Sequence, residues 1–244
     1  GEIITSGSQS YGDLGGVTLG SNLTLTTIGG SASLLAFAGK IDASLASTSA
    51  PDLTLDLTGT ATFNAPVGAS APLGRITIDN SYGTRFASSL TADSLVFQAA
   101  SKSVPPATAG ANYLEFLGDL TLTSSLEFNP SQAGNYQPAF DVSLLGFTNR
   151  IGGVNGQTIF DNKGLLTIGR AVAKSSTTFE GGVMASQAKI SLAGLIQAGQ
   201  GTDGAVIDFD GSDAVNPVAD GFIELRHDVT TRDPVELRGR VVKL

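Results

Sequence analysis

The chain has 244 residues, and 22 acidic against 14 basic side chains give it a net charge of −8. It has no run of Lys or Arg with interleaved aromatic residues, which argues against a nucleic-acid-binding protein. It has no cysteine, which excludes a disulfide framework and thiolate metal sites. No apolar run approaches the ~20 residues of a membrane-spanning helix. The chain begins at Gly1 without methionine or an apolar leader segment, so we expect a processed product or an excised fragment.

Residues 52–80 set the pattern that the rest of the chain repeats. Over 53–57, leucine alternates with threonine and aspartate, which indicates a strand with one buried face. The alternation resumes at Ala61 and Phe63, and again at Ile76 and Ile78. The turns between these segments are too short to hold a helix, so three short strands lie within about thirty residues.

Two short motifs recur along the chain. The first is a strand in which Thr or Ser stands between two apolar residues, at 23–25, 53–55, 76–78, 120–122, 142–144, 166–168 and 190–192. The second places Phe before a tight turn, in AFAGKI at 36–41, TFNAPV at 62–67, EFLGDL at 115–120, EFNPSQ at 127–132, IFDNKG at 159–164, TFEGGV at 178–183 and DFDGSD at 208–213. Copies roughly 20–30 residues apart are typical of the rungs of a β-solenoid.

A stacked repeat explains how such short strands bury their apolar side chains. One rung cannot cover its own apolar face, but the rungs above and below it can. The sequence therefore predicts an all-β, right-handed parallel β-helix of about 9–11 rungs, roughly 45–50 Å long at ~4.8 Å per rung. An antiparallel β-sandwich is the alternative, because short strands and turns suit that fold too.

Three segments interrupt or test this pattern. Ser101–Ala111 contains two adjacent prolines and is predicted to be a loop, because proline cannot lie in a central strand. Asn129–Pro138 is predicted to be a second loop. Val183–Ala198 has apolar residues loosely spaced for a helix, but Ile190–Leu192 fits the strand motif and Gly194 disfavours a helix, so we predict strands there.

The composition changes at about Gly221, which divides the chain into a repeat region, 1–220, and a charged terminal region, 221–244. Nine of the last twenty-three residues are charged: Glu224, Arg226, Asp228, Arg232, Asp233, Glu236, Arg238, Arg240 and Lys243. Apolar alternation persists at Ile223 and Leu225. We expect terminal strands with a charged outer face, acting as a cap or as a contact with another subunit or the next repeat.

The repeats resemble those of large bacterial adhesins of the filamentous-haemagglutinin-like family. The resemblance lies in GSQSYGDLGGVTLGSNLTLTT at 7–27, LTLDLTGTATFNAPVG at 53–68 and PLGRITID at 72–79. It implies a β-helical passenger region of a secreted, extracellular protein at the bacterial cell surface, acting in adhesion and biofilm formation. The NPNL- and NPNG-type motifs of that family's secretion domain are not matched, since only Asn129-Pro130 and Asn216-Pro217 occur.

Few residues suggest catalysis or metal binding. His227 is the only histidine, and its charged surroundings favour a surface strand position over a catalytic role. Gly152–Gly156 lacks the strand–loop–helix context of a phosphate-binding loop. Asp208, Asp210 and Asp213, preceded by Asp203, are a weak calcium candidate, because alternating carboxylates near glycine resemble a calcium loop that lacks its closing Glu. We predict no catalytic residue and no other cofactor.

We therefore expect a non-enzymatic structural or adhesive protein: a β-helical stalk, or a self-stacking subunit of an extracellular fibre. The ends of a solenoid present unpaired backbone groups, so we expect self-association there or contact with neighbouring repeats of a longer chain. Host or matrix glycans are the expected ligands of an adhesive surface. The alternative is a polysaccharide lyase or hydrolase, because stacked rungs can align carboxylates on one face.

Overall fold

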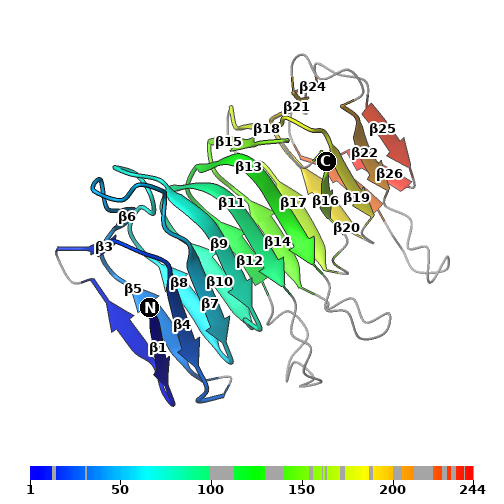
Figure 1. Cartoon of the computed structure of the whole chain (residues 1–244). Coiled ribbons are helices and arrows are strands. Elements are labelled where there is room, and N and C mark those ends of the chain that lie inside the picture. Colours follow the sequence, from blue (N-terminus) through cyan, green and yellow to red (C-terminus); the bar gives the residue numbers. More distant parts are fainter. Residues whose placement is uncertain are drawn as a thin grey trace.

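The computed structural model shows a β-solenoid in which every described strand pairing is parallel (Figure 1). Strands stack side by side from the N-terminal end to the C-terminal end, and no helix in the described part of the chain is long and apolar enough to cross a membrane. The parallel pairing confirms the predicted class and excludes the antiparallel sandwich. The described residues are 1–12, 15–30, 32–98, 113–129, 140–153, 156–160, 162, 164–170, 174–186, 189–199, 205–210, 222–226, 230–231, 235–238 and 240–243.

Each rung of the solenoid has three sides, and one long sheet forms the second side. This sheet contains β2 (Gln9–Tyr11), β5 (Leu34–Phe37), β8 (Thr60–Phe63), β10 (Gly83–Phe86), β12 (Tyr113–Phe116), β14 (Asp141–Leu144), β17 (Leu165–Ile168), β20 (Lys189–Leu192), β23 (Phe222–Leu225) and β26 (Arg240–Lys243). Strands β23 and β26 extend it in register, so the charged terminal region continues the same stack.

The first side begins in one sheet and ends in another. It contains β1 (Glu2–Thr5), β4 (Leu23–Thr27), β7 (Leu53–Leu57), β9 (Leu73–Asp79), the second halves of β11 (Leu90–Gln98) and β13 (Leu120–Asn129), and then β16 (Thr158–Phe160), β19 (Val183–Ser186), β22 (Ile207–Asp210) and β25 (Val235–Arg238). Strand β16 packs against β13, where the rings of Phe128 and Phe160 lie 5.1 Å apart.

The third side has the shortest strands. It contains β3 (Val17–Leu19), β6 (Ile41–Ala43), a bridge at Val67, the first halves of β11 and β13, β15 (Thr148–Ile151), β18 (Ser176–Phe179), β21 (Leu195–Ala198) and β24 (Thr230–Thr231). The pairing of β11 with β13 shifts register between Ala92 and Ser94. At this bulge both strands turn the corner from the third side to the first, which is why one sheet crosses between the sides.

The number of rungs depends on how complete a rung must be. Each of the two long sheets stacks ten strands. The solenoid nevertheless makes about seven turns, fewer than the predicted nine to eleven rungs, because several rungs lack a strand of three residues on the third side. The third rung has only Val67 on its third side, the ninth has the two-residue β24, and the tenth has no described strand there. The right-handed winding stays a prediction.

Apolar side chains fill the interior in columns that run along the solenoid axis. Leu25, Leu55 and Ile78 are register partners on the first side, and all three are 0% exposed. On the second side, Tyr11 begins a column of stacked rings that continues through Phe37, Phe63, Phe86 and Phe116, with centroids 4.5–5.2 Å apart. Similar apolar side chains one strand spacing apart bury one another, so each rung depends on its neighbours.

The segments singled out in the sequence have different outcomes. Val183–Ala198 forms β19, β20 and β21, which confirms the prediction of strands over helix. The predicted loop Ser101–Ala111 lies outside the described residues, as does Asn129–Pro138 except for Asn129, the last residue of β13. The proposed division at residue 220 also lies outside them.

Candidate functional site

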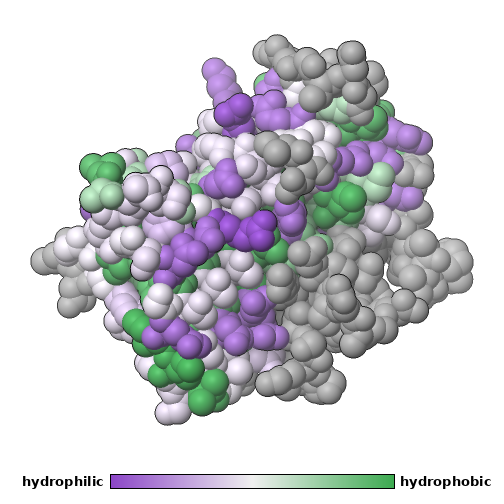
Figure 2. Space-filling view, in the orientation of Figure 1, coloured by the Kyte–Doolittle hydropathy of each residue, from purple (hydrophilic) through white to green (hydrophobic). Residues whose placement is uncertain are grey.

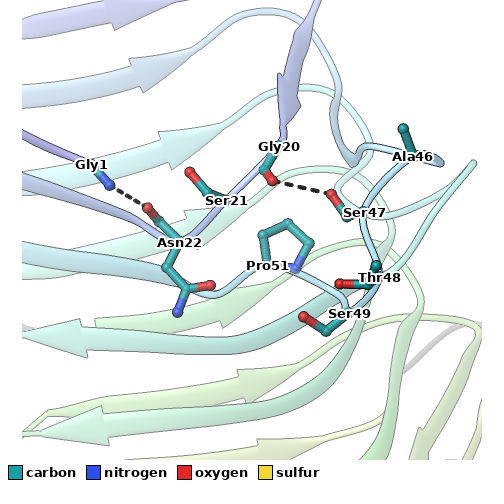
Figure 3. A pocket seen from close by; sticks show the side chains of 9 residues that line it. All are labelled: Gly1, Gly20, Ser21, Asn22, Ala46, Ser47, Thr48, Ser49 and Pro51. Carbon is teal, nitrogen blue, oxygen red and sulfur yellow. Dashed lines mark hydrogen bonds between the residues drawn. The ribbon is translucent and has the colours of Figure 1, made fainter.

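A hollow lies between two turns that lead from the third side of the solenoid to the first. The shorter turn, 20–22, joins β3 to β4, and the longer one, 44–52, joins β6 to β7. Because the second turn is longer, it projects beyond the first and leaves a space of about 580 Å³ beside it. Figure 3 shows the residues that line this space, namely Gly1, Gly20, Ser21, Asn22, Ala46, Ser47, Thr48, Ser49 and Pro51.

Hydrogen bonds between the two turns hold the walls of the hollow. The Ser47 hydroxyl donates to the Gly20 carbonyl oxygen at 3.2 Å. The Asn22 side chain accepts a hydrogen bond from the Asp52 backbone N–H at 3.0 Å, and its Nδ2 donates to the Asp52 carboxylate at 3.4 Å. Asp52 also accepts the backbone N–H of Arg75 at 2.7 Å, so three successive rungs are tied together below the hollow.

The lining is polar and carries no charged side chain. Ser21, Thr48 and Ser49 are exposed, and within the part of the chain that the structure describes their hydroxyl groups have no protein partner. The buried Pro51 lies between them in Figure 3, with Thr48 and Ser49 on one side and Ser21 on the other. The arrangement offers donors and acceptors to a neutral polar ligand. Sequence reasoning missed this site, although the run SLASTSAP at 44–51 was a signal of a hydroxyl-rich turn.

Two aspartates face each other on the outer surface of the first side. Asp56 of β7 and Asp79 of β9 are register partners, and Asn80 donates to the Asp56 carboxylate at 2.8 Å. Burial and the charge of Asp56 raise the pKa of Asp79 above its ordinary value of 3.8. Among the described residues, this pair is one example of the aligned carboxylates expected of a polysaccharide-active enzyme, and the sequence alone did not indicate it.

Other charged side chains near the surface link neighbouring rungs. Arg85 of β10 pairs with Glu115 of β12 at 2.6 Å, and Arg150 of β15 pairs with Glu180 at 2.9 Å. Asp93, at the bulge of β11, accepts hydrogen bonds from the hydroxyls of Thr123 at 2.8 Å and Ser124 at 2.5 Å. These bonds hold the pKa of Asp93 below 3.8. These three contacts act between adjacent rungs, whereas the ion pairs Lys40–Asp42 and Arg226–Glu224 each lie within one rung.

Asp42 is a buried carboxylate that fixes a surface turn. Burial pushes the pKa of Asp42 up, but hydrogen bonds from the backbone N–H groups of Ser70 and Ala71 and the ammonium of Lys40 more than offset this, so its pKa lies below 3.8. The Ser70 N–H lies 2.8 Å from the carboxylate, and the Lys40 ammonium lies 3.1 Å from it. These contacts explain how the Asp42 carboxylate can be buried in its charged form without a bound ligand.

The calcium candidate is only partly described. Asp208 and Asp210 lie two residues apart on β22, on the face opposite Ile207 and Phe209, and Asp208 is nevertheless buried, at 8% exposed. Asp208 is in register with Met184 and Glu236 on the neighbouring strands. Among the described residues no three His, Cys, Asp or Glu side chains are placed to hold a metal ion. Asp203, Asp213 and His227 lie outside the described part, so the calcium hypothesis stays a prediction.

The coloured face in Figure 2 is mostly weakly polar to hydrophilic, with apolar side chains gathered in a few places. Exposed apolar residues include Ile4 and Ile28 in the first two rungs, Leu45 beside the hollow, and Ile159 and Met184 on the first side. Ile159 and Met184 are register partners on β16 and β19.

No family model matches the chain, and comparisons with curated proteins and with solved structures find no match either. The resemblance to filamentous-haemagglutinin-like adhesins therefore depends on the sequence motifs at 7–27, 53–68 and 72–79, with which the parallel β-solenoid is compatible.

Proposed function

We propose that the chain is a non-enzymatic, adhesive stalk of the bacterial cell surface. The observation that carries the proposal is the continuous stack of ten strands on the second side, in register from Gln9–Tyr11 to Arg240–Lys243. Such a stack extends to roughly 48 Å at ~4.8 Å per strand. A rod that grows by adding rungs separates its two ends and displays surface along its length, which suits a spacer or an adhesin.

The distribution of polar groups supports this proposal. The ion pairs Arg85–Glu115 and Arg150–Glu180 join adjacent rungs, as does the contact of Asp93 with Thr123 and Ser124. Polar contacts of this kind stabilise the stacking of adjacent rungs and therefore the elongated rod. An enzyme of this fold would instead gather carboxylates around one bond.

An adhesion assay tests the proposal. The purified chain, coupled to beads, should attach to cells or to extracellular matrix, and beads carrying the heat-denatured chain should not. Retention of native and denatured beads at equal levels would contradict an adhesive role. Localisation is tested separately, by labelling intact cells of the source with an antibody against the chain, which should stain the surface.

We further propose that the end of the rod at β1 contacts another rung, either of the same chain or of a second copy. The first rung leaves Ile3 40% exposed, although its register partner Leu25 is fully buried. Electron microscopy of the purified chain should show fibres if copies stack. Deleting residues 1–6 should then abolish the fibres while the β-rich circular dichroism spectrum persists. Short rods of one length at high concentration would rule out stacking.

The Asp56–Asp79 pair favours a second candidate, a polysaccharide-active enzyme. A carboxyl group with a raised pKa beside a second carboxyl group is the arrangement that glycoside hydrolysis uses. The chain should be incubated with pectin-, alginate- and chitin-like polymers. If the wild type cleaves a polymer, and cleavage is lost in Asp79→Asn but retained in Asp93→Asn, the chain is an enzyme and not an adhesive stalk.

A further inference from the structure

We infer that the hollow between turns 20–22 and 44–52 is a subsite for a short, neutral glycan. The inference deepens the proposed adhesive function and rests on it, because it names a surface and a ligand class. At about 580 Å³, the hollow is within the range of small-molecule sites and is large enough for a few sugar rings.

The chemistry of the lining selects the ligand class. The hydroxyl groups of Ser21, Thr48 and Ser49 have no partner among the described residues and can each donate and accept hydrogen bonds. Sugar hydroxyls have the same dual character, so the two sets complement each other. None of the lining residues has a charged side chain, and the one charge in the lining, the ammonium of Gly1, already donates to the Asn22 carbonyl oxygen at 2.6 Å. The side chains of the lining therefore offer no partner to the charge of a sulfated or uronic acid sugar.

The turns are positioned before a ligand arrives. Ser47 is bonded to Gly20 across the hollow, and Asn22 is bonded to Asp52 through both its oxygen and its nitrogen. These contacts connect the two turns, while the hydroxyls of Ser21, Thr48 and Ser49 stay without a partner among the described residues. A site whose walls are already fixed loses less conformational entropy on binding.

Nuclear magnetic resonance of the full chain tests the site. Maltotriose, cellotriose and chitotriose are the neutral probes, and trigalacturonate is their acidic counterpart. We expect at least one neutral probe to shift the amide signals of Ser21, Thr48 and Ser49, with trigalacturonate binding at least tenfold more weakly. Absence of shifts in this region with every neutral probe, or stronger binding of trigalacturonate, would overturn the inference.

Three variants separate this site from other surfaces. Ser21→Trp places a large ring in the hollow from an exposed position and should abolish binding of the responsive probe. Thr48→Val removes one hydroxyl at constant shape and should raise Kd by about two- to tenfold, the equivalent of one net hydrogen bond. Thr54→Val makes the same change on the outer face of β7, outside the hollow, and should leave Kd unchanged.

The outcomes test the glycan site and the proposed adhesive function separately. If Ser21→Trp binds the probe as well as the wild type does, the site is wrong. If beads carrying Ser21→Trp also still attach to cells or matrix, adhesion uses another surface and the proposed function stands. If wild-type beads do not attach at all, the adhesive function is wrong, and the probe titration alone then decides whether the hollow binds sugars.

Discussion

The ring of Phe63 stacks on the ring of Phe86 with centroids 4.5 Å apart and planes inclined by 9°. Phe63 also stacks on Phe37, at 4.8 Å, so each of its faces contacts another ring one rung away. The three residues are between 1% and 2% exposed. The column is therefore a place where the loss of one side chain leaves a cavity between two rungs.

We expect Phe63→Ala to lower the free energy of unfolding by about 3–5 kcal/mol, the usual cost of removing a buried Phe side chain. Phe63→Leu keeps much of the apolar volume and should cost clearly less. Leu45→Ala is the control, because Leu45 is 89% exposed and its truncation should change stability by less than about 0.5 kcal/mol. Urea denaturation measures all three, and equal midpoints for Phe63→Ala and Leu45→Ala would contradict the role of the column.

Asp79→Asn should stabilise the protein at neutral pH. Burial and the nearby Asp56 raise the pKa of Asp79, so the folded chain disfavours the ionised form. The stability linked to protonating Asp79 is present below pH 3.8, the ordinary pKa of the group. It is lost as the pH rises through the higher pKa of Asp79 in the folded chain. The Tm of Asp79→Asn should therefore exceed that of the wild type at pH 7, and the difference should shrink toward pH 3. A lower Tm at pH 7 would show that Asp79 makes a favourable contact when ionised.

Asp93→Asn should have the opposite effect. The hydroxyls of Ser124 and Thr123 donate to the Asp93 carboxylate and lower its pKa, so the folded chain favours the ionised form. This stabilisation is present above 3.8 and is lost as the pH falls through the lower folded pKa. We expect the Tm of Asp93→Asn to be lower than that of the wild type at pH 7. The difference in Tm should shrink as the pH falls toward 2.5. A reduction that is constant between pH 7 and pH 2.5 would contradict the charge-assisted bonds.

The sequence predicted the class of fold because the alternation of apolar and polar residues directly reports the buried face of a strand. It did not predict which side of the solenoid each strand occupies. The motif with Thr or Ser between apolar residues lies on the first side at 23–25, on the third at 120–122 and on the second at 142–144. All three sides bury one face against the same core, so they require the same pattern.

The candidate site could not be predicted because contacts between rungs assemble it. Ser21 and Thr48 are distant in the sequence, and only the stacking of β4 on β7 brings their turns together. The Asp56–Asp79 pair has the same origin, since register between β7 and β9 places these carboxylates side by side. Loop lengths between strands vary along the chain, so the spacing of residues does not reveal which of them become neighbours.

Two glycines share a positive φ but differ in how closely an added Cβ would approach the next rung. Gly169 has φ +83°, and a Cβ there would lie 1.9 Å from the Ala193 carbonyl oxygen. Gly30 has φ +86°, but a Cβ there would meet no atom within 4 Å. Gly30→Ala should cost only about 1–2 kcal/mol, the penalty of the left-handed conformation. Gly169→Ala should cost clearly more, because the next rung must also move. Thermal denaturation compares them, and equal losses would show that the two rungs can separate freely.

The Arg170 guanidinium joins three rungs at the corner between the second and third sides. Its Nε donates to the Leu145 carbonyl oxygen, its Nη2 donates to the Leu117 carbonyl oxygen at 2.8 Å, and the group lies 4.6 Å from the centre of the Phe147 ring. Lysine keeps the charge but cannot make the planar fork that reaches both carbonyls. Arg170→Lys should therefore lower the free energy of unfolding by about 1.5–3 kcal/mol, the range for hydrogen bonds to charged groups.

Arg150→Lys is the matched control for Arg170→Lys. Arg150 is 60% exposed and, among the described residues, pairs with Glu180 at the surface, where an ion pair contributes about 0–1 kcal/mol. Urea denaturation at low and high salt separates the two variants. The loss in Arg170→Lys should persist in 0.5 M NaCl, because its partners are neutral carbonyl groups, whereas any loss in Arg150→Lys should diminish as salt screens the ion pair. If both substitutions cost the same and respond equally to salt, Arg170 does not hold the corner together.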